Sequence, residues 1–315
     1  MTEPMFAQNL PGLGRHYVHP ATGEVWPSVT NVISLGVAKP ALQGWAAKQA
    51  SLAAFDSLPA MVAALSTPAC GAKKVAERCG VCRECVRAEI QARHRIVSEE
   101  AADRGSDTHQ IARREALGLP VEDYDPKLHN LVGLVKKFWS DFGIDLGRDV
   151  VLSEATVYNR TAGYAGTLDL VARIGEGFVI RRFMGYEPVG GKRRAVFEDV
   201  PMAPGLWLID YKTSQSNQAV YAESGLQLAG LANAEMVLFD TGAEAKFELP
   251  EPLAGWAICK LVDMPVDAPF YKLVDMPMGG SKEDAFTAFQ HVLGTANWLI
   301  GQHGVKESII TKGNL

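Results

Sequence analysis

Two short segments place acidic and basic side chains beside apolar neighbours, in a pattern that could bind a metal ion and activate water. One is Gly166-Thr-Leu-Asp169, and the other is Leu208-Ile-Asp210-Tyr-Lys212. Alternate residues of a strand point to the same face, so Asp210 and Lys212 project together, and burying them is costly unless they are paired or bound to a metal. Two carboxylates on adjacent strands can share Mg²⁺, while the lysine orients or deprotonates water or stabilises charge on a phosphate. The alternative is a structural ion pair between Asp210 and Lys212.

Three further polar residues are candidates for the same site. His109 lies in a predicted helix, Glu154 lies one predicted strand before the first carboxylate, and Gln227 lies in a later predicted helix. We expect Glu154 to join the metal site or orient its ligands. Each residue also has a structural alternative, because a helical histidine often belongs to the core or surface and Glu154 could be an exposed strand residue.

Four of the five cysteines form a second candidate metal site. Cys70, Cys79, Cys82 and Cys85 follow the spacing C-x8-C-x2-C-x2-C. Four closely spaced thiols in a chain without an export signal favour metal binding over free or redox-active thiols. Zinc is one candidate ion, and the run from Cys79 to Cys85 is also similar to part of a ferredoxin-type iron–sulfur motif. Cys259 is expected to be a buried strand residue.

Hydrophobic periodicity and glycine positions predict the elements that must place these side chains. We expect helices over residues 41–65, 86–117, 126–142, 216–234 and 282–302, and strands over residues 150–158, 165–174, 206–211, 236–239 and 255–262. Residues 66–95 are rich in cysteine and charge, and the glycine-rich residues 175–205 are expected to form a β-hairpin insertion. The segment Lys-Leu-Val-Asp-Met-Pro occurs at 260–265 and again at 272–277, which suggests a duplicated strand and turn.

Composition limits the class of protein. The 315 residues are 47% hydrophobic and 21% charged, as in an ordinary folded protein, and no apolar run is long enough to span a membrane. The first residues show no basic segment followed by an apolar run, so we expect a cytoplasmic protein. The formal net charge is −5, so any nucleic-acid site must be local. Residues 71–95 and 181–194 carry concentrated cations and are the candidates for contact with a nucleic-acid backbone.

Taken together, the motifs resemble the PD-(D/E)XK nuclease superfamily, in its RecB-like and phage-exonuclease branch. That branch has an ordered series: a Gly-x-x-x-His helix, a Gly-x-x-Asp strand, a Glu/Asp-x-Lys strand and a Gln-x-x-x-Tyr helix. The counterparts here are Gly105-Ser-Asp-Thr-His109, Gly166-Thr-Leu-Asp169, Asp210-Tyr-Lys212 and Gln227-Leu-Ala-Gly-Leu231, with Leu231 in place of the tyrosine. Trp26-Pro-Ser-Val-Thr30 and residues 39–45 are similar to the N-terminal region of phage exonucleases of this kind.

This resemblance implies an α/β fold with a restriction-endonuclease-like core, in which a mixed central β-sheet is flanked by helices. A single nuclease domain over residues 1–315 would carry a cysteine-bearing insertion at 66–95 and the hairpin insertion at 175–205. The implied activity is a Mg²⁺- or Mn²⁺-dependent DNA exonuclease of phage or bacterial recombination or replication, with DNA and a single-strand annealing or recombinase protein as partners. A structure-specific endonuclease and a non-catalytic DNA-binding protein of the same fold are the alternatives.

The resemblance also assigns the residues of the site. Asp169, Asp210, Lys212 and Gln227 would be catalytic, and His109, Glu154, Asp169 and Asp210 would hold Mg²⁺ or Mn²⁺. Superfamily members with an iron–sulfur cluster have three cysteines after the glutamine motif, whereas all four clustered cysteines here precede His109. That placement favours zinc over an iron–sulfur cluster in the 66–95 segment.

Overall fold

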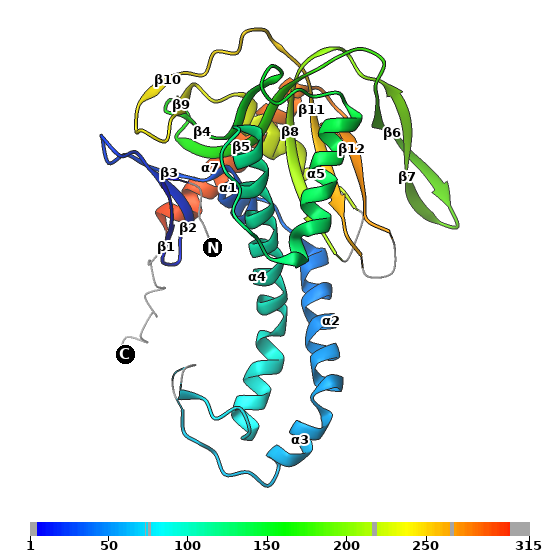
Figure 1. The fold of residues 1–315 in the computed structure, drawn as a ribbon. Helices are drawn as coiled ribbons and strands as arrows, with labels where there is room; N and C mark the ends of the chain where they lie inside the picture. Colours follow the sequence, from blue (N-terminus) through cyan, green and yellow to red (C-terminus); the bar gives the residue numbers. More distant parts are fainter. Residues whose placement is uncertain (1–4, 73, 75–76, 216–218, 265–267, 303–315) are drawn as a thin grey trace, which may run out of the picture. The chain divides into compact units, whose positions relative to one another are not determined.

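The computed structural model describes residues 5–302, except 73, 75–76, 216–218 and 265–267 (Figure 1). The chain divides into two compact units. The larger comprises residues 1–37 and 105–315, and the smaller comprises residues 38–104. The smaller unit includes the cysteine-rich segment 66–95.

A mixed β-sheet is the centre of the larger unit. Its strands among the described residues are β4 (Val150–Asn159), β5 (Tyr164–Ile174), β6 (Val179–Val189), β7 (Lys192–Pro201), β8 (Gly205–Ser214), β9 (Met236–Leu238), β10 (Glu244–Lys246), β11 (Leu253–Val262) and β12 (Phe270–Met276). Their order is β10-β9-β4-β5-β8-β11-β12-β6-β7. The pairs β8–β11 and β12–β6 are parallel and the other neighbours are antiparallel. Residues 175–205 contain the β6–β7 hairpin.

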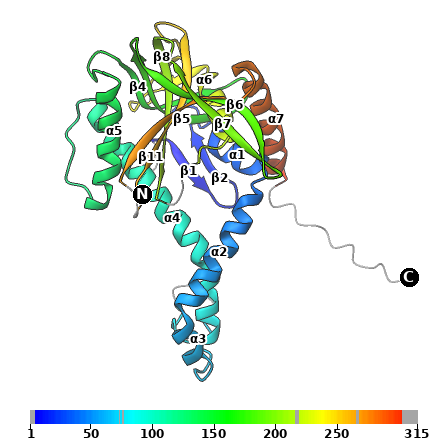
Figure 2. The same cartoon turned by 90° about the vertical axis from the view of Figure 1, so that its right-hand side faces the viewer.

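Helices cover both faces of this sheet. Buried side chains of α1 (Val29–Gly36), α6 (Glu223–Ala232) and α7 (Lys282–Gly301) form one apolar cluster with the sheet, and α1 lies beside α7 (Figure 2). On the other face, α5 (His129–Asp141) and the end of α4 (Arg83–Ala116) pack against a second cluster. The expectation of an α/β fold, with a mixed sheet flanked by helices and a cysteine cluster, is therefore confirmed.

Short elements complete the larger unit. The strands β1 (Ala7–Leu10), β2 (Gly14–Val18) and β3 (Val25–Pro27) form a small antiparallel sheet, and the 3₁₀ helix η2 (Pro126–Leu128) leads into α5. No helix among the described residues is both long and apolar enough to cross a lipid bilayer.

Two predicted helices differ from the structure. Residues 41–65 form two helices, α2 (Pro40–Asp56) and α3 (Leu58–Ala64), because Pro59 lacks the N–H that would continue a single helix. The helix predicted over 216–234 begins only at Glu223; residues 216–218 lie outside the described residues, and residues 219–222 are not helical.

Candidate metal centres

The first candidate centre lies where two neighbouring strands separate. The pairing of β5 with β8 ends at Leu170 and Ile209, and Asp169 and Asp210 are the next residue on each strand. The ladder hydrogen bonds stop there, so the backbone N–H of Tyr211 is free to donate to Asp169 Oδ2, at 2.7 Å. The separation of the strands thus makes room for two carboxylates that the strands themselves bring together.

His109 and Glu154 approach the same point from α4 and β4. His109 Nδ1 lies 3.0 Å from Glu154 Oε1 and 3.3 Å from Asp169 Oδ1. These three residues offer ligand atoms that all lie within 4.8 Å of one another. Glu154 has a φ of 46°, a left-handed backbone conformation that costs about 1–3 kcal/mol in a residue other than glycine and is concentrated at functional sites.

Lys212 and Gln227 hold Asp210, which lies outside that group of three. Lys212 Nζ lies 2.8 Å from Asp210 Oδ2 and 3.1 Å from Oδ1, and Gln227 Nε2 donates to Oδ1 at 2.6 Å. Gln227 Oε1 also accepts a hydrogen bond from Lys212 Nζ at 3.0 Å. Asp210 Oδ2 is buried and, although close to the ammonium, accepts no hydrogen bond of good geometry from the described residues. One lone-pair site of this carboxylate therefore remains for another ligand.

Two glycines allow the helices to come this close to the strands. A Cβ atom at Gly166 would lie 2.6 Å from Leu231 of α6, and one at Gly105 would lie 3.4 Å from Thr213 at the end of β8. Leu231, at the position of the family tyrosine, is 1% exposed and packs in the apolar cluster of α6. It therefore has a packing role.

The carboxylates carry more negative charge than the nearby cations neutralise. Burial, followed by repulsion from Asp169, raises the pKa of Glu154 to about 7. Burial also raises the pKa of Asp210 to about 6, against the attraction of Lys212. Burial lowers the pKa of His109, but Asp169 and Glu154 together raise it more, so this pKa lies well above its ordinary value. An added cation would relieve this crowding.

Sequence reasoning missed two contributors to this region. The backbone N–H of Tyr211 is one of them, and side-chain patterns carry no signal for it. The other is Lys260 on β11, which pairs in register with Lys212 and is only 7% exposed. The repeated segment was the available signal, because Lys260 and Lys272 are the first residues of its two copies.

The second candidate centre is formed by the four cysteines of the smaller unit. Cys70 Sγ lies 3.5 Å from Cys85 Sγ and 3.7 Å from Cys82 Sγ, and Cys79 Sγ lies 3.8 Å from Cys85 Sγ. Four sulfurs bound to one tetrahedral ion at ~2.3 Å would be about 3.8 Å apart. The cluster can therefore bind a metal ion.

Local backbone groups prepare these thiols to bind a metal. The backbone N–H of Cys82 donates to Cys79 Sγ at 3.3 Å. Hydrogen bonds from the backbone at Cys79 and Ala72 lower the pKa of Cys70 to about 6. The backbone at Gly80 lowers the pKa of Cys85, but burial and the three neighbouring thiols raise it more, to about 11. Thiolates are the ligating form, so the backbone donors favour metal binding at Cys70, while Cys85 must lose its proton as the ion binds.

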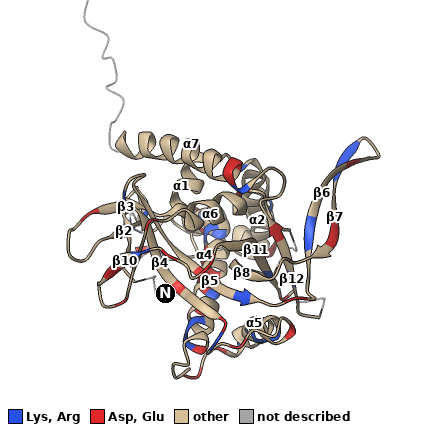
Figure 3. Ribbon diagram, turned by 90° about the horizontal axis from the view of Figure 1, so that it is seen from above, with Lys and Arg blue, Asp and Glu red and all other residues tan. Residues whose placement is uncertain are grey.

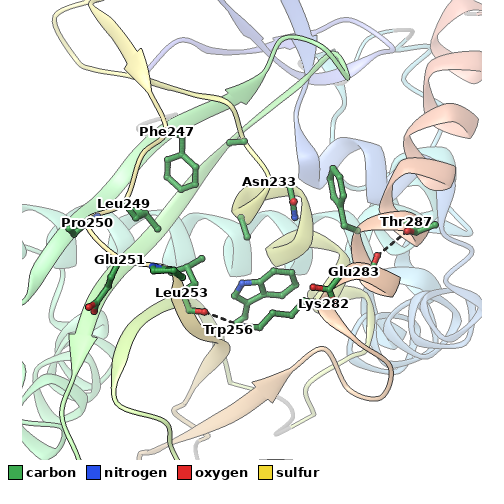
Figure 4. A pocket seen from close by; sticks show the side chains of 14 residues that line it. Asn233, Phe247, Leu249, Pro250, Glu251, Leu253, Trp256, Lys282, Glu283 and Thr287 are labelled. Carbon is green, nitrogen blue, oxygen red and sulfur yellow. Dashed lines mark hydrogen bonds between the residues drawn. The ribbon is translucent and has the colours of Figure 1, made fainter.

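The larger unit also contains a cavity of about 720 Å³, which none of the carboxylate-site residues lines (Figure 4). Phe247, Leu253 and Trp256 line it, and Lys282 Nζ lies 5.4 Å from the ring centroid of Trp256. Trp256 is in register with Leu208 of β8, two residues before Asp210, and the cavity extends from there toward the start of β11.

Comparison with known proteins adds no relative. No protein-family model matches the chain, and no curated protein matches it significantly in sequence.

Proposed function

We propose that this protein is a divalent-metal-dependent nuclease that hydrolyses phosphodiester bonds in DNA, built on a restriction-endonuclease-like core of the PD-(D/E)XK type. The observation that carries the proposal is the convergence of all four motifs at the end of the β5–β8 pairing. One residue or more from each motif of the series lies there, although the motifs are far apart in sequence. These residues are His109, Asp169, Asp210, Lys212 and Gln227. A purely structural Asp210–Lys212 pair would not require His109 and Glu154 to meet beside it.

The residues present fit Mg²⁺ or Mn²⁺. Carboxylate oxygens with one imidazole are ligands that these hard cations accept. Burial, and after it repulsion from Asp169, raises the pKa of Glu154 and of Asp210, and a bound cation would offset both effects. His109, Glu154, Asp169 and Asp210 would hold the cation. When bound, the cation would supply Lewis-acid activation of water and neutralise charge on the phosphate.

Lys212 acts as a fixed hydrogen-bond donor in this proposal. Burial lowers its pKa, but Asp210 and Asp169 raise it more, so its pKa lies above the ordinary value and the ammonium stays protonated. Two of its hydrogens point to Asp210 and to Gln227 Oε1, which leaves the third for a water molecule or a phosphate oxygen. Gln227 positions this pair by bonding to both partners.

We also propose that the cysteine cluster holds a single zinc ion. Sulfur–sulfur distances of 3.5–3.8 Å suit one tetrahedral ion. An iron–sulfur cluster puts several iron and sulfide atoms between its cysteines, so their sulfurs would be farther apart. Elemental analysis should find about one zinc per chain; iron with acid-labile sulfide would replace zinc in this account.

End-labelled linear DNA and closed circular DNA, each with Mg²⁺ or Mn²⁺ and with EDTA as the control, test the proposed activity. We expect metal-dependent digestion of the linear DNA from its ends and no products from the closed circle. Cleavage products from the closed circle would show that the activity is that of an endonuclease on the same core and not of an exonuclease. Binding of DNA without digestion of either substrate would leave the non-catalytic alternative.

A further inference from the structure

Three lysines form a row across neighbouring strands, starting at the carboxylate site. Lys212 of β8 is in register with Lys260 of β11, which lies directly opposite Lys272 of β12. Directly paired residues on adjacent strands project from the same face of a sheet, so the three side chains share one face. This is the face on which α6 packs, because Leu208, Ile258 and Met276 of these strands belong to the apolar cluster of α6.

The row has an excess of positive charge. Among the described residues, neither the Lys260 side chain nor the Lys272 side chain makes a hydrogen bond or an ion pair. Burial, with repulsion from Lys212 and Lys272, lowers the pKa of Lys260 to about 8. Like charges side by side in a half-buried sheet are unfavourable unless an anion binds them.

The row ends at a cavity of about 420 Å³ between β12, the β6–β7 hairpin and the segment before α6. Four aromatic side chains line it together with two cations, Lys272 and Arg181. The aromatic residues are Phe183, Tyr186, Phe197 and Tyr221. The ring centroid of Phe183 lies 5.1 Å from that of Tyr186 and 5.6 Å from that of Phe197. Aromatic side chains with adjacent cations are the usual platform on which unpaired bases stack.

Three arginines of the hairpin, whose cations are coloured in Figure 3, have acidic partners. Arg182 pairs with Asp275 at 2.6 Å, Arg194 pairs with Glu187, and Arg181 pairs more loosely with Asp199 at 3.4 Å. Arg193 lies over the ring of Tyr186, 4.8 Å from its centroid, so a further cation lies beside the aromatic residues of the cavity.

We propose that the lysine row and the aromatic cavity form a site for a single-stranded segment of DNA, whose phosphates lie at Lys272, the accessible end of the row beside the buried Lys260, and whose unpaired base enters the cavity. This inference rests on the proposed nuclease function, because it extends the substrate from the carboxylate site. A cavity of this size suits a ligand such as a nucleobase. The lysine row reaches the cavity at Lys272, which is opposite Lys260 in the sheet and also lines the cavity.

Binding without cleavage tests this single-strand site independently of catalysis. Fluorescence anisotropy would follow a labelled oligothymidylate and a labelled blunt duplex on the full chain without added Mg²⁺ or Mn²⁺, because EDTA would also remove the zinc proposed for the cysteine cluster. Tyr186→Ala and Tyr221→Ala change exposed side chains, so the fold should survive, and each should weaken single-strand binding about tenfold. Lys272→Gln should reduce the slope of log affinity against log salt by about 0.7. Trp298→Ala on α7 and Lys246→Gln on β10 are matched exposed controls that should change neither quantity.

The outcomes separate this single-strand site from the activity. Single-strand binding that fails in the tyrosine variants supports the site even if no metal restores cleavage. The site is overturned if wild-type protein does not bind oligothymidylate, or if the tyrosine variants bind it as tightly as wild type. If the tyrosine variants lost as much affinity for the blunt duplex as for the single strand, the single-strand assignment would also be overturned. In each of these cases, metal-dependent cleavage by wild-type protein would still support the nuclease proposal.

Discussion

The cysteine cluster and the carboxylate cluster each bring polar side chains close enough to share an ion, but the chain assembles them over different distances. Cys70 and Cys85 are 15 positions apart, and the four sulfurs meet within one short segment and the start of α4. The carboxylate cluster draws on α4, β4, β5, β8 and α6, and depends on where the β5–β8 pairing ends. The cysteine centre forms within one short segment and offers soft sulfur atoms. The carboxylate centre forms only when distant strands and helices come together, and it offers mainly hard oxygen atoms.

This difference implies separate roles. A short segment with few buried apolar residues gains stability from its ion, since the free energy of metal binding adds to that of folding. The sheet of the larger unit has an extensive apolar core and does not need a metal to fold. Its carboxylates are instead held in a crowded arrangement, which is a cost to stability that an active site can tolerate.

The largest effect is expected from a cysteine variant. Cys82 is fully buried at the centre of the cluster, so Cys82→Ser should remove the zinc and expose residues 66–95 to proteolysis. Structural zinc in finger peptides contributes about 10–16 kcal/mol, so the loss should be complete. Elemental analysis and limited proteolysis measure it, with Cys259→Ala as the cysteine control outside the cluster. Retention of one zinc per chain by Cys82→Ser would contradict the assigned ligand set.

Loss of the lysine should slow cleavage without removing the metal. Lys212→Met deletes the donor and should lower the cleavage rate about 10²–10³-fold. Binding of Mn²⁺, measured by calorimetry, should persist because an ammonium is not a ligand. An exposed control, Lys246→Met, should retain full activity. If Lys212→Met instead unfolds the protein and its residual activity follows the folded fraction, Asp210 and Lys212 form a structural pair.

The stability of the metal-free protein should depend on pH through the carboxylate cluster. The folded-state pKa values of Glu154 and Asp210 are about 7 and about 6, above the ~4 of an unfolded chain. The folded state then binds more protons than the unfolded state, so this contribution to the free energy of unfolding falls as pH rises from about 4 to about 7. The raised pKa of His109 acts with the same sign, and its contribution is lost above its ordinary range.

Urea denaturation without added Mg²⁺ or Mn²⁺ across this window measures the effect, about 1–3 kcal/mol. Glu154→Gln should remove part of the decrease, and added Mn²⁺ should stabilise wild-type protein more at pH 7 than at pH 5. A wild-type stability that rises relative to Glu154→Gln through this window would show that the carboxylates are not crowded.

The smallest effect is expected at Gln227. Gln227→Ala removes one hydrogen bond to Asp210 and one to Lys212, but leaves their ion pair. We expect about a tenfold fall in kcat with little change in KM, because the residue positions other groups. An unchanged kcat would limit Gln227 to packing.

The local centre and the ordered motifs could be predicted from sequence, whereas the sheet-dependent details could not. Cysteine spacing predicted the sulfur cluster, and strand alternation predicted that Asp210 and Lys212 share a face. The left-handed Glu154 lies within the β4–β5 pairing, whereas the donor N–H of Tyr211 lies where β5 and β8 separate; no local sequence pattern encodes either feature. From the sequence, Lys260 was interpreted only as part of a duplicated strand. Its position beside Lys212 could not be predicted, because it depends on the parallel register of two strands that are far apart in sequence.

Cleavage by Asp210→Asn tests the central claim most directly. This change keeps the size of the side chain and removes its charge, so the zinc content and melting temperature should stay near those of wild type. We predict that the well-folded variant loses at least about 10³-fold in the rate of Mg²⁺-dependent cleavage of linear DNA, since a ligand and the partner of Lys212 are both lost. Asp240→Asn, an exposed carboxylate on the surface, is the matched control and should keep full activity. Full cleavage by well-folded Asp210→Asn protein would contradict the assignment of this site.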